Sequence, residues 1–307
     1  MRSSSGPASV CGTLVRALRL ENALTDFTRI LRNYSHSQFS NDVDILRAFS
    51  GILRRVCDTL GNHGAISGLP IALLDGCLVL EPLRNNTLRR RPMFPSYSWV
   101  GWRGPIAIGL GGLPDNGWQQ SSTWIFFHTR YADRPPDLVL LPYRALKSSD
   151  KGLVNYQKSP AIQFFPEWRD FFLHESFQTG PTADDGRDLT NTTYALLQFW
   201  TFSMFFRISI FDRLLGRAGI IYKNVKVGET TLDGFGENPF FELDRDFEFI
   251  FLSLAPKSLP KAPKFHVMIV EQCGPFAERR GIGYVELENL RIDTAISQPY
   301  WKEIILA

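Results

Sequence analysis

The chain has 307 residues, which is enough for one large domain or two small ones with a sizeable hydrophobic core. Hydrophobic residues make up 44% of the chain and charged residues 21%, a balance that excludes an intrinsically disordered protein. The formal net charge of +3 is too small to indicate binding to nucleic acid.

The four cysteines lie far apart and form no CxxC or Cys/His cluster. They are Cys11, Cys57, Cys77 and Cys273. This spacing favours reduced thiols over disulfides, and hence an intracellular, cytoplasmic protein. The most apolar segment, residues 194–211, contains Gln198 and Arg207 and falls short of the roughly 20 apolar residues of a membrane-spanning helix. We therefore expect no membrane span.

Residues 1–20 are rich in serine and contain no acidic side chain before Glu21. The composition is only weakly that of a transit peptide, and the apolar core of a secretory signal is missing. We interpret residues 1–20 as a disordered leader.

Apolar residues recur at helical spacing in two segments that follow the leader, up to residue 60. The first segment begins at Glu21 and the second runs from Val43 to Leu60, where Gly61 can end it. Ser40 or Asn41 can cap the second helix. The two helices predict a hairpin whose apolar faces need a partner, because a helix pair alone buries too little.

The rest of the predicted helical region, which spans residues 21–92, has weaker signals. The apolar run after Gly68 predicts a turn and then a short strand over residues 77–80. Arg89, Arg90 and Arg91 follow in a polar stretch, and we expect all three in a solvated loop.

Residues 90–104 contain four aromatic residues, two prolines and two glycines. Pro92 and Pro95 favour extended backbone, because proline fixes its own φ and restricts the residue before it. We therefore expect a strand from Ser96 that places Trp99 and Trp102 on opposite faces. We interpret both tryptophans as anchors of the core; the alternative is an aromatic platform for a sugar or a partner protein.

Residues 93–307 are predicted to form a β-rich domain, with a partly flexible insertion around residues 131–190 where the strand pattern weakens. Short β-branched or aromatic runs predict strands at residues 124–128, 195–201, 204–211, 219–222, 248–253, 266–271, 281–285 and 304–306. A longer loop is expected at residues 229–238. No helix-length segment separates successive strands, which argues against a parallel sheet. The predicted fold class is α+β, with the helical hairpin packed on a predominantly antiparallel β-sandwich or open barrel.

The sequence offers no convincing catalytic group. The five histidines are scattered without metal-ligand spacing, and Glu175 beside His174 favours a surface pair. Two S-x-x-K matches, at residues 148–151 and 258–261, lie in predicted loops, and no G-x-S-x-G motif is present. The glycines at residues 109–112 and 281–283 open no predicted helix, and Glu278, Arg279 and Arg280 favour the charged approach to a hairpin. We therefore predict no catalytic, cofactor-binding or metal-binding residues.

One segment resembles a known family. Residues 94–102 are similar to the P-S-W-S-W-A-G-W signature that follows the catalytic-looking domain of fungal heterokaryon incompatibility (HET) domain proteins. The residues that carry this structural signature are Phe94, Pro95, Ser96, Ser98, Trp99, Gly101 and Trp102. Tyr97 stands where the family has tryptophan, and Val100 where it has alanine.

Further segments resemble the same family in the same order along the chain. Residues 34–35 and 44–52 are similar to its "YS…D.LNAFSGI" segment, residues 68–70 to "GLP", and residues 196–206 to "L.FWTSSAFF". Residues 248–253, 267–271 and 277–283 are similar to "EFI.LS", "VMLIE" and "AER.G.G". The resemblance thus covers most of the chain after residue 34.

The resemblance implies a role in fungal nonself recognition and regulated cell death, although the motifs of the HET domain itself are missing before these segments. The chain therefore resembles the C-terminal region alone, as a truncated gene model, a decayed paralogue or a free-standing accessory module. We expect a noncatalytic interaction or regulatory region with a protein partner, for which the missing HET domain is a candidate. The alternatives are an unrecognised hydrolase or carbohydrate-binding β module, and a pseudogene product.

Overall fold

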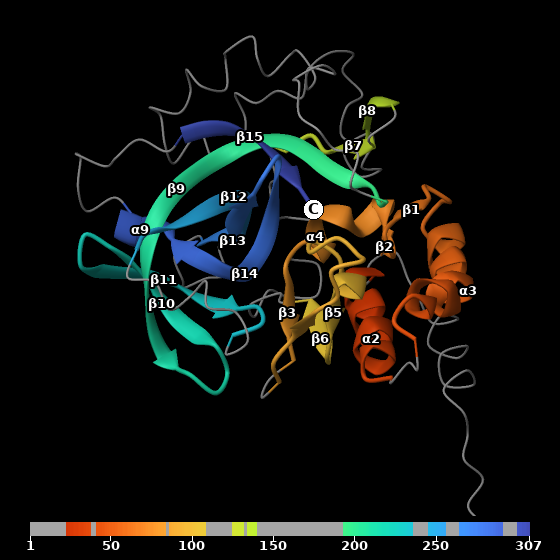
Figure 1. Ribbon diagram of the computed structural model, residues 1–307, viewed down its shortest axis with the longest axis horizontal. Coiled ribbons are helices and arrows are strands. Elements are labelled where there is room, and N and C mark those ends of the chain that lie inside the picture. Colours follow the sequence, from red (N-terminus) through yellow and green to blue (C-terminus); the bar gives the residue numbers. More distant parts are fainter. Residues whose placement is uncertain are drawn as a thin grey trace, which may run out of the picture.

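The computed structural model describes residues 23–37, 41–83, 86–108, 125–131, 134–139, 193–235, 245–255, 264–290 and 300–307. These residues form two layers of unequal size: helices and short strands from the first third of the chain, and a strongly curved sheet from the remainder (Figure 1). The predicted leader, residues 1–20, lies outside the described residues.

The two predicted helices are present as α2 (Ala23–Ser35) and α3 (Asp44–Thr59). Their apolar faces meet, with the ring centroids of Phe27 and Phe49 6.5 Å apart. The predicted cap is wrong at Asn41, because the residue before α3 is Val43 and α3 has no side-chain cap. The Asn41 side chain instead accepts a hydrogen bond from the Val43 N–H (3.2 Å) and closes the preceding turn.

The helical layer continues with short elements. They are β1 (Ala65–Ile66), β2 (Leu69–Pro70), η2 (Ile71–Leu73), α4 (Leu74–Cys77), β3 (Leu80–Pro82), β4 (Arg89–Arg90), η3 (Trp99–Gly101), β5 (Trp102–Arg103) and β6 (Ile106–Ile108). The strand predicted over residues 77–80 begins only at Leu80, as β3, since Cys77 ends a helical turn that the Leu78 N–H closes on the Leu74 carbonyl (3.1 Å). Gly76 lets this turn approach α2, because a Cβ there would lie 2.6 Å from the Leu24 side chain.

The remaining strands form one nine-stranded sheet, which is antiparallel except for one parallel pairing of β14 with β15. They are β7 (His128–Tyr131), β8 (Arg134–Leu138), β9 (Leu196–Asp212), β10 (Arg217–Tyr222), β11 (Val225–Leu232), β12 (Phe247–Ala255), β13 (Lys264–Cys273), β14 (Phe276–Glu286) and β15 (Tyr300–Leu306), with a short helix α9 (Leu287–Leu290) after β14. The order is β10-β11-β14-β13-β12-β9-β7-β8, and an additional pairing of β10 with β9 curls the sheet. The predicted α+β class is confirmed, and the single curled sheet fits an open barrel rather than a sandwich.

Strand β9 organises the sheet. The two strands predicted at residues 195–201 and 204–211 are one continuous strand, which sweeps across the top of Figure 1. Its first half pairs with β15 and β7, and its second half pairs with β10. Ser203 lies opposite both Ile250 of β12 and Tyr300 of β15, so β9 joins neighbours on both of its edges.

Two further predictions along the sheet need correction. The loop predicted at residues 229–238 is wrong at its start, because residues 229–232 end strand β11, whose burial pattern alternates as in a half-buried strand. The strand predicted at residues 124–128 begins only at His128. Most of the proposed insertion at residues 131–190 lies outside the described residues, although β8 falls within it.

None of the helices in the described residues combines the length and apolar character needed to cross a membrane.

Candidate functional site

The structure brings the seven signature residues together, but not on a strand. A tight turn follows Ser96 and leads into the 3-10 turn η3, because the Ser98 hydroxyl accepts from the Val100 N–H (3.4 Å) and the Gly101 N–H bonds the Ser98 carbonyl (3.0 Å). The predicted strand from Ser96 is therefore wrong. The side chains of Ser96, Ser98, Trp99 and Trp102 are all buried, Phe94 is half-buried, and Pro95 and Gly101 are buried.

Trp99 anchors the signature to the helical layer. Its ring lies edge-on to Phe49 and Tyr34, with centroid distances of 4.8 and 5.9 Å. Its indole N–H donates to the Gly68 carbonyl at 3.0 Å. Gly68 has φ +83°, and a Cβ there would lie 2.9 Å from the indole nitrogen, so glycine is required on both counts.

Ser96 anchors the same segment to the sheet. Its backbone N–H donates to the Ala307 carbonyl (2.8 Å), and its hydroxyl accepts from the Arg279 N–H (2.8 Å) and also donates to Ala307. The Trp102 indole N–H donates back to the Ser96 carbonyl at 2.7 Å. The signature thus links three distant parts of the chain through backbone groups.

Arg90 and Arg91 also serve this segment, so the prediction of a solvated loop is wrong for both. The Arg90 guanidinium donates to the carbonyls of Phe94 (2.7 Å) and Gly101 (3.2 Å) and lies 5.6 Å from the centroid of the Trp102 ring. Arg91 is buried and forms an ion pair with Asp42 at 2.9 Å. Of the three arginines, Arg89 alone has an exposed side chain.

Arg279 is fully buried, which overturns the prediction of a charged hairpin approach for this residue. Its guanidinium pairs with Asp233 (Nε to Oδ2, 2.6 Å), and both side chains are 0% exposed. It also donates to the carbonyls of Leu78 (3.4 Å) and Leu80 in the helical layer. Burial raises the pKa of Asp233, and the neighbouring Arg279 charge opposes that rise. We use the term junction for residues 90–102 together with Asp233, Arg279 and Ala307.

The sequence pointed to the signature but missed Asp233 and Arg279. The only available signal for Arg279 was its place in the family-like segment at residues 277–283. The polar side chains of the junction bond mainly to protein groups and are largely shielded from solvent, so the junction is built for packing; Arg90 Nε is the one buried polar side-chain atom of the junction, among the described residues, that lacks a hydrogen bond. The aromatic-platform alternative for Trp99 and Trp102 loses its basis, since the two residues are 1% and 2% exposed.

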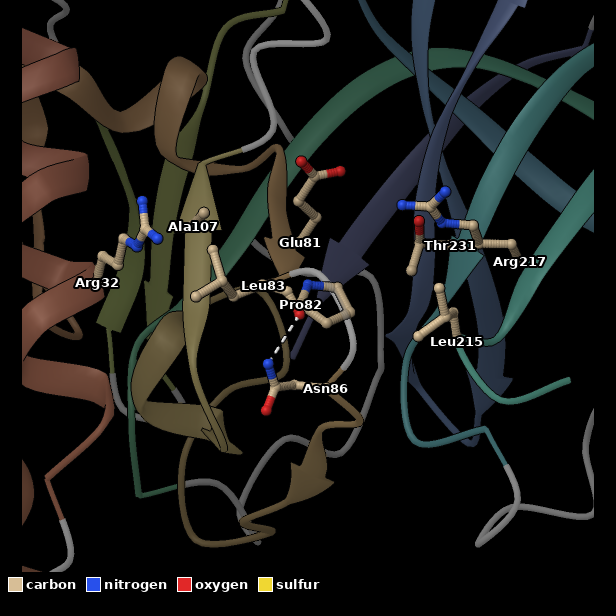
Figure 2. Close-up of a pocket in the computed structure, with 9 residues that line it drawn as sticks. All are labelled: Arg32, Glu81, Pro82, Leu83, Asn86, Ala107, Leu215, Arg217 and Thr231. Atoms are coloured by element: carbon tan, nitrogen blue, oxygen red, sulfur yellow. Dashed lines mark hydrogen bonds between the residues drawn. The ribbon is translucent and has the colours of Figure 1, made fainter. Parts of the chain in front are cut away.

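Beside the junction, a cleft opens between the two layers, and we call it the interlayer cleft. It has a volume of about 430 Å³. Arg32 of α2 lies on one side, Arg217 of β10 on the other, and Glu81 of β3 between them (Figure 2). The other described lining residues are Pro82, Leu83, Asn86, Ala107, Leu215 and Thr231. The Asn86 side chain donates to the Leu83 carbonyl at 3.2 Å.

A second hollow, which we call the aromatic groove, lies on the sheet beside the β10–β11 turn and has a volume of about 340 Å³. Phe205 and Tyr300 line it and are 50% and 64% exposed. Arg207 and Asp246 form an exposed ion pair at its edge, 3.4 Å apart. The groove therefore offers aromatic surface with charges of both signs.

The structure gives little support to hydrolase chemistry within the residues it describes. Each hollow has one carboxylate among its described lining residues, Glu81 in one and Asp246 in the other, whereas a glycosidase needs a pair. Ser253 and His266 lie 2.9 Å apart on neighbouring strands, but burial lowers the pKa of His266 to about 4, which makes it a poor general base. His174 and both S-x-x-K segments lie outside the described residues.

The described residues also contain no group of three His, Cys, Asp or Glu side chains that could hold a metal ion. Three cysteines, Cys57, Cys77 and Cys273, are free thiols, as predicted, and Cys11 lies outside the described residues. Burial raises the pKa of the Cys77 thiol well above its usual range, so this thiol stays protonated and unreactive.

Comparison of the chain with protein-family models, with curated proteins and with solved structures gave no match.

Proposed function

We propose that this chain is a noncatalytic interaction or regulatory region of a HET-type protein of fungal nonself recognition, and that it acts on a HET domain. The observation that carries the proposal is the convergence of the family-like segments. Trp99 of the signature bonds Gly68 of the "GLP" segment, and Ser96 bonds Arg279 of the "AER" segment. The segments that resemble this family lie far apart in the sequence, yet they contact one another in the folded chain.

Other family-like segments meet in the sheet. Ser203 of the segment at residues 196–206 donates to Glu248 of the segment at residues 248–253, at 2.6 Å. The Tyr97 hydroxyl donates to the Ala195 carbonyl, also at 2.6 Å, directly before the first of these segments. The contacts are buried or half-buried, which is typical of residues retained for packing rather than for catalysis.

The aromatic groove supports a role in contacting a protein. Exposed aromatic side chains are enriched at the centres of protein interfaces, and two of them line this one hollow. We propose the groove as the surface that a HET domain contacts.

The proposal can be tested with purified chain and a purified HET domain of the family, by calorimetry, and by co-expression of the two in a fungal host with cell death as the readout. We expect measurable binding and a change in cell death. The double variant Phe205→Ser/Tyr300→Ser should lose both. Phe211→Ser is the matched control, because Phe211 is 56% exposed on the same strand as Phe205 but lies outside the groove.

Failure of the chain to bind the domain or to alter cell death would contradict the proposal. Equal loss of binding in Phe211→Ser and in the groove variant would contradict the assignment of the groove.

A further inference from the structure

The interlayer cleft has the dimensions of a small-molecule site. Its volume of about 430 Å³ lies within the range of roughly 300–1,000 Å³ typical of ligand pockets. Its walls come from both layers, and the junction beside it fixes one layer against the other through Arg279, which bonds Leu78 and Leu80 immediately before the cleft residue Glu81. The cleft is therefore pre-formed by the packing of the two layers.

Two guanidinium groups line this cleft without a partner among the residues that the structure describes. Among the described residues, neither the Arg32 nor the Arg217 side chain has a hydrogen bond or ion pair. Asp212 lies opposite Arg217 across the β9–β10 pair, but its carboxylate accepts from the N–H groups of Leu214 and Leu215 and so holds the turn instead. Residues one turn from Arg32 on α2 are Thr28, Arg29 and Ser35, none of which is acidic.

Two guanidinium groups in one cleft favour an oxyanion. Arginine presents its N–H donors as a planar fork that matches phosphate and carboxylate oxygens. The described lining residues include two positively charged side chains, those of Arg32 and Arg217, and one negatively charged side chain, that of Glu81. Glu81 already takes part in another interaction. The local charge balance therefore favours an anion over a cation.

The other lining residues indicate the chemistry of the uncharged part of the ligand. Glu81, Asn86 and Thr231 supply acceptors and donors suited to hydroxyl groups. No aromatic side chain is found among the lining residues that the structure describes, so the cleft gives a nucleobase no ring to stack on. We infer that the interlayer cleft binds a small polyhydroxylated phosphate ester of the sugar phosphate class, with its phosphate on one of the two guanidinium groups and its hydroxyl groups towards Glu81, which lies between them. This site is separate from the aromatic groove and goes beyond the proposed function.

The inference is tested by calorimetric titration of the full chain with glucose 6-phosphate, glucose and inorganic phosphate. We expect saturable binding of glucose 6-phosphate that weakens as salt is raised, weaker binding of phosphate, and none of glucose. At least one of Arg32→Gln and Arg217→Gln should weaken the binding of glucose 6-phosphate by about tenfold or more, since it removes the charge-assisted hydrogen bonds to the phosphate. Glu81→Gln should reduce the preference for glucose 6-phosphate over phosphate.

Arg213→Gln is the matched control, because Arg213 is an exposed arginine four residues before Arg217 and does not line the cleft. It should bind like the unmodified chain. Thermal midpoints of the variants should stay close to that of the unmodified chain, because neither cleft guanidinium has a partner to lose in the described part of the chain. The inference is overturned if glucose 6-phosphate does not bind at millimolar concentration, if both cleft variants bind as the unmodified chain does, or if Arg213→Gln loses as much binding as the more affected cleft variant.

Discussion

A fully buried arginine is tolerated in a protein only when its charge and its donors are all satisfied, because the desolvation of an unpaired guanidinium costs several kcal/mol. Arg279 meets this condition through Asp233 and two backbone carbonyls. The carboxylate comes from the turn after β11, the guanidinium comes from β14, and the carbonyls come from the helical layer. The Arg279 side chain is therefore satisfied only when β14, the turn after β11 and the helical layer are correctly assembled.

At this scale, we predict that Arg279→Met lowers the free energy of unfolding by about 3–5 kcal/mol, because it leaves the Asp233 carboxylate buried without its partner. Urea denaturation measures the change. The double variant Arg279→Met/Asp233→Leu should recover part of the loss, because it removes both charges. Arg207→Met is the control, since the Arg207–Asp246 pair is exposed and should be worth at most about 1 kcal/mol. A single variant Arg279→Met that stays within 1 kcal/mol of the unmodified chain would refute this prediction.

The sequence predicted the burial of a single residue correctly where its residue type occurs mainly in one environment. Tryptophans flanked by proline and glycine were predicted to anchor the core, and Trp99 and Trp102 are buried. The sequence did not predict which charged residues are buried, because a charged run such as Arg89–Arg91 or Glu278–Arg280 is normally solvated. The partner that reverses this expectation for Arg279 lies 46 residues away, and no local pattern reveals it.

At the scale of elements, side chains of three neighbouring strands form a polar row across the sheet. Ser253 of β12, His266 of β13 and Tyr284 of β14 lie directly opposite one another. The Lys264 ammonium, two residues before His266 in sequence, lies 3.6 Å from the centroid of the Tyr284 ring. Burial and the Lys264 charge lower the pKa of His266 to about 4, and burial together with Glu229 raises the pKa of Tyr284 to about 12. The row is therefore held in neutral forms.

This row predicts a pH dependence of stability. Because the pKa of His266 is about 4 in the folded protein and 6.5 ordinarily, the unfolded chain binds the extra proton between these values. The free energy of unfolding should fall as the pH drops from about 6.5 towards 4, by at most about 3 kcal/mol from this group. Urea denaturation at several pH values measures the slope, and His266→Asn should have a shallower slope. An unchanged slope in His266→Asn would exclude this residue as the source.

Helices and strands could be predicted from the sequence where the spacing of apolar residues determines them. They could not be predicted where a hydrogen-bonded turn or the register of strand pairing determines the backbone. The helical spacing located α2 and α3 closely, and most strands of the sheet were located within a few residues. The signature was predicted as a strand because its prolines and aromatics fit extended backbone, yet hydrogen bonds of Ser98 fold it into a turn. The charge pattern of the interlayer cleft was invisible, because Arg32 and Arg217 are separated by most of the chain.

At the scale of the whole molecule, the junction joins the helical layer to the sheet. Trp99 packs on Phe49 and Tyr34 of the helices, while Ser96, three residues earlier, bonds Arg279 near the start of β14 and Ala307. A helix pair of this size buries too little surface to be stable alone. The helices should therefore depend on the sheet, and loss of the junction should loosen both.

Trp99→Ala tests this dependence. The variant removes a side chain that is 1% exposed, together with its hydrogen bond to Gly68, and should lower the free energy of unfolding by about 3–5 kcal/mol. Native-state hydrogen exchange should show amides of α2 and α3 and amides of β13 and β14 losing protection together, because one cooperative unit contains them all. Met93→Ala should change neither group, since Met93 belongs to the same segment but is 43% exposed.

If protection falls in the helices alone, the two layers fold independently and the junction is only a contact between them. An unchanged free energy of unfolding in Trp99→Ala would instead return the tryptophan to the binding interpretation, because a core anchor of this size cannot be removed without cost.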